Sequence, residues 1–210
     1  MRRFYFFALV VALVFSLSFS TAMAEMFNGP YIGVNLGYGS TDYKTDVGPG
    51  TLTLDSLSGS GVNAGLFAGY GATSPQGIYF GIEAEGSWSS GDVDVDLMGA
   101  KAELSQDWTL GLTARLGGML TETILGYVRA GWVATKFEAE VPPLAWSQKK
   151  TFTGPRIGLG LEFPINKDVS FRTDYTYTWY QSKDLDDAGV PVMSVKPSEQ
   201  LFRIGFAYNF

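Results

Sequence analysis

Cysteine and histidine are both absent from this chain of 210 residues. Their absence excludes disulfides, thiolate nucleophiles, zinc sites of the usual ligand set and every catalytic triad that depends on histidine. Positive charge is also scarce, because 15 Lys and Arg residues stand against 21 Asp and Glu residues, for a formal net charge of -6. A nucleic-acid partner is therefore not expected.

Long apolar runs are absent except at the N-terminus, where residues 4–19 form one run after two arginines and before the small residues Ala22 and Ala24. This pattern predicts a secretory signal peptide over residues 1–24, cleaved near Ala24, and a single domain over residues 25–210. An uncleaved membrane anchor is the alternative, although the run is short for a helix that spans a bilayer. No later stretch is long and apolar enough to be a spanning helix, so any further membrane segment must be a strand.

The chain instead shows alternation of large apolar residues with small or polar ones. The last eleven residues show it most clearly, because every second residue from Phe202 to Phe210 is apolar, while Arg203 and Gly205 lie between them. Successive side chains of a strand point to opposite faces, so one face of this strand is apolar and the other is polar. The same pattern recurs in eight segments, at about residues 31–39, 61–71, 78–88, 106–116, 124–135, 156–163, 169–179 and 200–210.

The connections between these segments alternate between long and short, which is typical of an up-and-down barrel. The long connections lie at about residues 41–60, 89–105, 136–152 and 181–199, the first of them as a loop or a protruding hairpin. We therefore predict an all-β fold, an eight-stranded antiparallel up-and-down β-barrel.

The same alternation could belong to a soluble barrel or sandwich whose apolar face points inward. Three observations favour a transmembrane β-barrel with the apolar face toward lipid. The apolar faces carry no charge, the polar faces are rich in glycine as a narrow lumen requires, and aromatic residues gather at the two ends of the apolar rows. The predicted aromatic belts contain Tyr31, Tyr70, Trp88, Trp108, Trp132 and Trp179.

With Phe206, Tyr208 and Phe210 ending the chain, the sequence resembles the small outer-membrane β-barrels, the family that includes the transmembrane domain of outer membrane protein A and the opacity and Omp25-like surface proteins. The resemblance implies a multi-pass barrel in the outer membrane of a Gram-negative bacterium, in contact with outer-membrane lipid and lipopolysaccharide. It also implies that these three aromatic residues are the signal read by the barrel assembly machinery.

Ten charged residues fall on the polar faces of the predicted strands and are expected to point into the lumen. An eight-stranded barrel is only wide enough inside for side chains to fill it. Charges there need partners, and Arg with carboxylate offers bidentate hydrogen bonds. We predict an ion-pair network that plugs the lumen, with a narrow passive porin-like channel for small solutes as the alternative. The ten residues are Glu83, Glu85, Asp107, Arg115, Arg129, Arg156, Glu162, Arg172, Asp174 and Arg203.

Enzymatic activity is not expected, and a lipid-modifying barrel enzyme is the least favoured function. Glu83 and Glu85 would lie about 7 Å apart on one face, a spacing known from glycosidases, but a barrel interior has no groove for a sugar chain. Barrel enzymes of the outer membrane that deacylate lipid A or cleave peptides use a histidine, which this chain lacks. Residues 92–103 approach a calcium-loop pattern, yet Leu97 stands where the sharp turn requires glycine.

No cofactor and no metal are therefore predicted. The function that the sequence favours is that of a structural and surface-interaction protein, which presents four extracellular loops to a partner outside the cell.

Overall fold

The computed structural model describes the backbone of residues 24–47, 52–90, 92–97, 100–141, 146–181, 183–187 and 190–210. Side chains are described for residues 26–42, 59–90, 108–136, 151–181 and 197–210. The predicted signal peptide lies outside the described residues except for Ala24. Within the described part of the chain, no helix has the length and the apolar character needed to cross a membrane.

A short 3-10 helix, η1 (Ala24–Phe27), precedes the strands. Eight strands are long: β1 (Gly29–Val47), β2 (Leu52–Thr73), β3 (Ile78–Ser89), β5 (Ala100–Met119), β6 (Leu125–Val141), β7 (Trp146–Pro164), β8 (Val169–Trp179) and β10 (Val190–Asn209). Two are short: β4 (Asp92–Leu97) and β9 (Lys183–Asp187).

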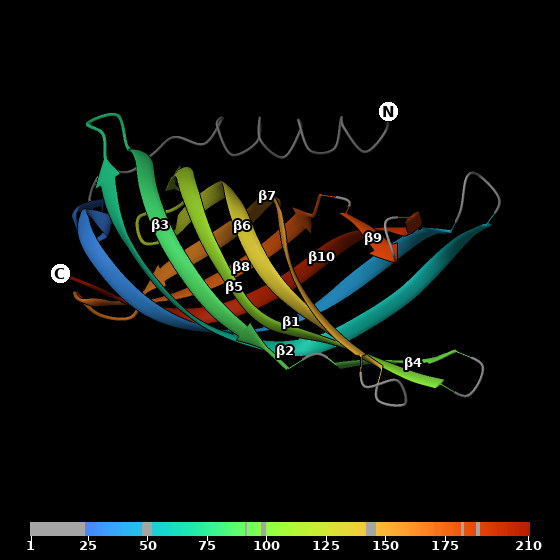
Figure 1. Cartoon of the computed structure of the whole chain (residues 1–210). Helices are drawn as coiled ribbons and strands as arrows, with labels where there is room; N and C mark the ends of the chain where they lie inside the picture. Colours follow the sequence, from blue (N-terminus) through green and yellow to red (C-terminus); the bar gives the residue numbers. More distant parts are fainter. Residues whose placement is uncertain are drawn as a thin grey trace.

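The eight long strands form a closed antiparallel barrel (Figure 1). They pair in the order β1-β2-β3-β5-β6-β7-β8-β10, and β10 pairs back with β1, with Tyr31 opposite Asn209. The predicted eight-stranded antiparallel fold is confirmed.

The predicted long loops are shorter than expected, because most of their residues extend the strands. β1 and β2 continue as one protruding hairpin, so that Val47 lies opposite Leu52. β4 pairs with the start of β5, and β9 pairs with the start of β10. The polar composition of these segments indicated loops, but the backbone ladder needs no apolar side chains, and antiparallel pairing simply continues past the apolar zone. The calcium-loop pattern falls on the β4–β5 hairpin, where Asp92 to Leu97 form a strand.

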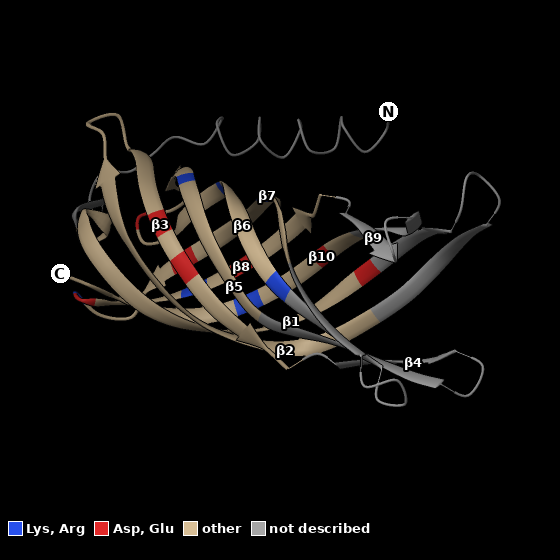
Figure 2. Cartoon of the chain, viewed as in Figure 1, with Lys and Arg blue, Asp and Glu red and all other residues tan. Residues whose placement is uncertain are grey.

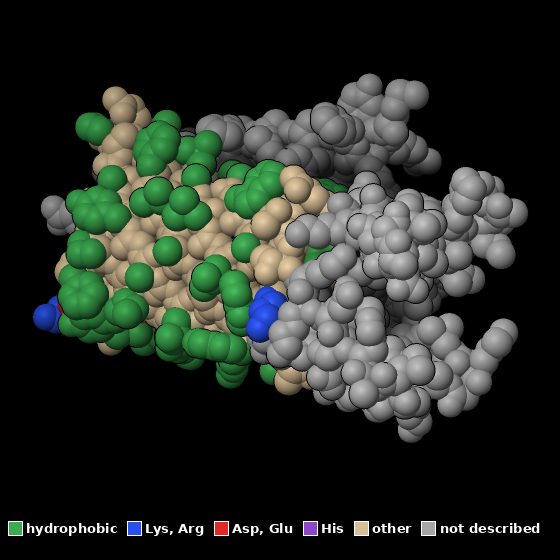
Figure 3. Space-filling view, viewed as in Figure 1, with side chains coloured by type: hydrophobic (Ala, Val, Ile, Leu, Met, Phe, Trp, Pro, Cys, Tyr) green, Lys and Arg blue, Asp and Glu red, His purple; other side chains and the backbone are tan. Residues whose placement is uncertain are grey.

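The outer surface of the barrel is apolar, as a surface in contact with lipid should be. Ile32, Val34, Leu36 and Tyr38 of β1 are 52 to 61% exposed, although they belong to the most apolar row of the strand. Figure 3 shows hydrophobic side chains spread over this outer face, with charged side chains only near its ends. Figure 2 marks where charged residues fall along the barrel strands. Most of those whose side chains are described on these strands are buried inside the barrel.

Candidate functional site: the ion-pair network of the lumen

Nine of the ten charged residues predicted to face the lumen are buried inside the barrel. Each has 7% or less of its surface exposed. The nine are Glu83, Glu85, Arg115, Arg129, Arg156, Glu162, Arg172, Asp174 and Arg203. The side chain of the tenth, Asp107, lies outside the described residues, and its backbone sits at a register shift between β5 and β6.

Glu85 on β3 binds three guanidinium groups from three other strands. Its Oε2 lies 2.7 Å from Arg129 Nη2 and 2.9 Å from Arg203 Nη1, while its Oε1 lies 2.8 Å from Arg156 Nη1. Because these arginines come from β6, β10 and β7, one carboxylate connects walls on different sides of the lumen.

Glu83, two residues earlier on the same face of β3, also faces three arginines. Arg172 Nη1 lies 2.7 Å from its Oε2 and Arg129 Nη2 lies 3.1 Å from its Oε1, while Arg115 Nη1 is more distant at 3.8 Å. Arg129 thus bridges Glu83 and Glu85, and it reaches Asp174 Oδ1 at 3.3 Å as well. The two glutamates therefore belong to a single network.

Tyrosine hydroxyls complete the network toward the short-turn end of the barrel. Tyr127 donates a hydrogen bond to Asp174 Oδ1 over 2.7 Å, and its ring lies 3.8 Å from the Arg115 guanidinium carbon. Tyr31 donates to Glu83 Oε2 over 3.1 Å and accepts a hydrogen bond from Arg115 Nη1 over 3.2 Å. A cation over an aromatic face is stabilised more strongly where water is excluded.

The burial of Tyr31 overturns its predicted place in an aromatic belt. Tyr31 is only 4% exposed and faces the lumen. The physical reason is the two-residue period of a strand, since Tyr31 shares its face with Gly33 and Asn35 and not with Ile32 and Val34.

The other residues predicted for the belts face outward. Tyr70, Trp88, Trp132 and Trp179 are 40 to 59% exposed, and Trp108 is half-buried beside its ladder partner Trp88. Phe206, Tyr208 and Phe210, predicted as the assembly signal, also lie on the outer face, and the rings of Tyr208 and Phe210 are 5.0 Å apart in an edge-on arrangement.

Glu199 and Tyr180 were missed because both fell at the edges of a predicted loop. Glu199 is 5% exposed, and its Oε2 lies 2.8 Å from Arg156 Nη2 and 3.0 Å from the Tyr180 hydroxyl. The signal was available, since Glu199 lies an even number of residues before Arg203 on the polar face of β10. With Glu199 included, five arginines and five carboxylates are buried among the residues whose side chains are described.

This arrangement pairs buried charges of opposite sign. Every oxygen of Glu83 and Glu85 contacts a guanidinium group, so neither carboxylate is free to act as a general acid or base. The described residues also contain no group of acidic side chains arranged to hold a metal ion.

Comparison with known proteins agrees with this architecture. The family model of the outer membrane protein beta-barrel domain matches residues 7–210. The 31 kDa outer-membrane immunogenic protein of Brucella melitensis is 28% identical over 200 residues, which cover 87% of this chain and 83% of that protein. The 25 kDa outer-membrane immunogenic protein of the same organism is 30% identical over 182 residues, covering 87% and 78%. The outer membrane protein OprG from Pseudomonas aeruginosa shares the fold, with a TM-score of 0.53 and 18% identity over 88% of this chain and 97% of that one.

Proposed function

Since this chain belongs to the outer membrane protein β-barrel family, we propose that it is a non-conducting barrel that anchors four surface hairpins in the bacterial outer membrane. The hairpins would meet a partner outside the cell, while the barrel itself would contact only lipid, lipopolysaccharide and, during insertion, the barrel assembly machinery.

The ion-pair network is the observation that carries the non-conducting role. Glu83 and Glu85 reach arginines on five of the other seven barrel strands, so charged side chains cross the lumen from wall to wall. A barrel of eight strands has room for these side chains but not for a water-filled channel beside them. An ion that crossed the membrane would have to separate buried pairs, each of which costs several kcal/mol to break, about 3 to 5 by typical measurements.

Planar-bilayer conductance of the purified protein tests this role. We expect no steady, reproducible openings from the wild type or from Lys167→Gln, a control at a side chain that is 88% exposed. Glu85→Ala removes the carboxylate shared by three arginines and should give openings. Steady channels in the wild type would instead establish the narrow passive channel as the function.

The protruding strands support the surface role. β1 and β2 stay paired for many residues beyond the part of the barrel whose outer face is apolar. A partner would therefore meet a hydrogen-bonded hairpin and not an irregular loop. The immunogenic relatives from Brucella melitensis are consistent with exposed surface segments.

A trimmed hairpin tests the surface role. Replacing residues 44–56 by Asn-Gly keeps the pairing up to Tyr43 and Leu57 and supplies a tight two-residue turn. Host proteins captured by the wild type but not by this variant would identify the partner. Equal capture by both proteins would show that this hairpin is not the binding surface.

We further propose that the barrel has no enzymatic activity, because its two adjacent glutamates are fully engaged by arginines. Lipid A from a deletion strain, compared with wild-type lipid A by mass spectrometry, should be unchanged.

A further inference from the structure

The short-turn end of the lumen contains an apolar cluster that adjoins the ion pairs. Phe27, on η1, is only 3% exposed although it precedes the first barrel strand. It packs with Tyr79, Met119, Leu125 and Tyr127, each of them 1 or 2% exposed. We call these five residues the Phe27 cluster.

The segment that carries Phe27 is held against the barrel rim by specific contacts. The backbone N–H of Thr73 donates a hydrogen bond to Asn28 Oδ1 over 2.6 Å. Gly29 has a φ of 115°, a backbone conformation that favours glycine and turns the chain from η1 into β1. At Gly71, a Cβ atom would lie 2.4 Å from the carbonyl oxygen of Phe27, so only glycine lets η1 lie this close.

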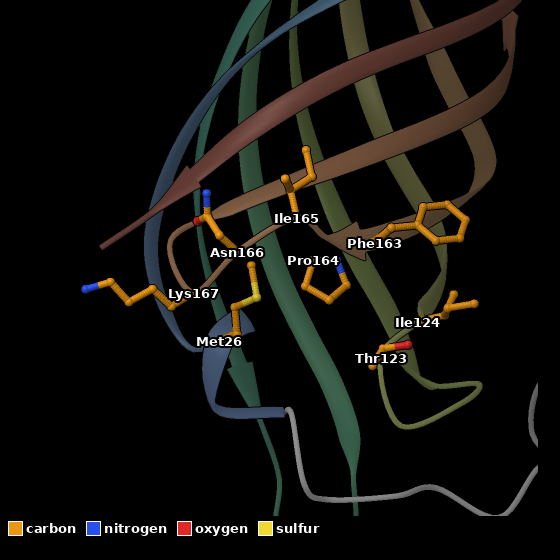
Figure 4. A pocket seen from close by; sticks show the side chains of 8 residues that line it. All are labelled: Met26, Thr123, Ile124, Phe163, Pro164, Ile165, Asn166 and Lys167. Atoms are coloured by element: carbon orange, nitrogen blue, oxygen red, sulfur yellow. The ribbon is translucent and has the colours of Figure 1, made fainter.

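Neighbouring residues of η1 have opposite environments. Phe27 points into the lumen, whereas Met26 lines an open hollow of about 800 Å³ between η1, the turn that follows β5 and the turn that follows β7. Figure 4 shows Met26 between Thr123 and Ile124 on one side and Lys167 on the other. The position of Phe27 is therefore specific, because η1 as a whole is not buried.

The cluster lies directly next to the ion-pair network. The rings of Tyr79 and Tyr127 pack in the cluster. The Tyr79 hydroxyl accepts a hydrogen bond from Arg115 Nη1 over 3.4 Å, and the Tyr127 hydroxyl donates one to Asp174 Oδ1 over 2.7 Å. The apolar cluster thus lies at the mouth of the lumen, just where the ion pairs end.

We propose that Phe27 is a lid residue, with which η1 closes the mouth of the barrel at its short-turn end. With signal-peptide cleavage after Ala24, Phe27 is the third residue of the mature chain. The lid packs through apolar contacts that open and close locally, so its labelling test does not depend on whether the ion pairs block the lumen.

Thiol labelling tests the lid, and the lack of native cysteine makes the reporter unambiguous. Met119→Cys places a single thiol in the Phe27 cluster. We expect a water-soluble, membrane-impermeant maleimide to label this thiol slowly in the folded barrel, and about tenfold or more faster when Phe27→Ala is added, because labelling follows local opening. Gly71→Ala, whose Cβ would meet both the carbonyl of Phe27 and the ring of Tyr79, should also raise the rate and serves if the alanine variant does not fold.

Three controls separate a lid from general loosening. Met26→Ala changes the outward neighbour on η1 and should leave the rate at Met119→Cys unchanged. Phe27→Leu, which restores apolar bulk, should slow the labelling again. A second reporter, Ser87→Cys, lies elsewhere in the lumen and should react equally fast with and without Phe27. Equal labelling of Met119→Cys with and without Phe27, or equal acceleration at both reporters, would overturn the proposal.

Discussion

Glu85→Gln should be among the most damaging conservative changes in this barrel. Glutamine keeps the size of the side chain but removes the charge that faces Arg129, Arg156 and Arg203. The described lumen would then hold five arginines against four carboxylates. Removing one partner of a buried ion pair costs about 3 to 5 kcal/mol, because the remaining charge stays buried.

The structure places the expected loss near the lower end of that range. Arg129 keeps Glu83 and Asp174, and Arg156 keeps Glu199, so both retain a counter-charge. Arg203 has no other ion pair among the described residues, and its Nε and Nη2 atoms already lack hydrogen-bond partners there. The destabilisation should therefore be about 3 kcal/mol and come mainly from Arg203.

Urea unfolding of the barrel in lipid vesicles, followed by tryptophan fluorescence, measures this loss. Lys167→Gln is the matched control at an exposed site and should change stability by less than about 0.5 kcal/mol. Adding Arg203→Met to Glu85→Gln restores charge balance and should recover part of the loss, with a coupling energy of about 0.5 to 3 kcal/mol.

The reasoning fails if Glu85→Gln unfolds within about 0.5 kcal/mol of the wild type. That result would mean that water already screens these charges, as it does for exposed ion pairs. A hydrated lumen would also remove the argument for a non-conducting barrel.

Three further changes test the two faces and the end of the chain. Gly33→Val should abolish folding, seen as loss of the compact band on unheated gels, since a Cβ there would lie 2.2 Å from Phe67 Cζ and 2.3 Å from the backbone oxygen of Phe206. Leu112→Arg, at an outer position that is 58% exposed, should cost about 2 to 4 kcal/mol of unfolding free energy in lipid, and no loss would mean that this face meets water. Deleting Phe210, which is 73% exposed, should lower the amount assembled in cells while the refolded protein unfolds at nearly the same urea concentration; normal assembly would show that the terminal residue is not part of the signal.

Strand periodicity explains both the success and the failures of prediction from the sequence. Once a strand's register is known, the face of every residue follows, which is why nine predicted lumen residues are buried. Tyr31 was wrongly predicted to lie in an aromatic belt because it is aromatic and lies near a strand end. Its position in the two-residue alternation of the strand places it on the inner face. In the structure, its hydroxyl lies within hydrogen-bonding distance of Glu83 and Arg115, so the polar tip of the ring explains its place inside.

Strand ends were harder to predict than strand faces. Apolar alternation stops where the barrel leaves the lipid, but hydrogen bonding between strands continues, as in β1 and β10, which stay paired as far as Val47 and Met193. Glu199 lies in this zone of polar sequence, and it was therefore assigned to a loop although it completes the charge balance of the lumen.

Which charged side chains pair within the network depends on the stagger between strands, and the alternation of apolar and polar residues does not reveal this stagger. Arg203 and Glu85 are 118 residues apart in sequence, and they meet because the strands are staggered around the barrel. Shifting one strand by two residues would keep every side chain on its face but bring different charges together. Composition and the two-residue period of the strands therefore predict that the lumen holds charged side chains whose charges sum to about zero. The ion pairs that cross the lumen depend in addition on the stagger of the strands, which places Glu83 and Glu85 within reach of five arginines.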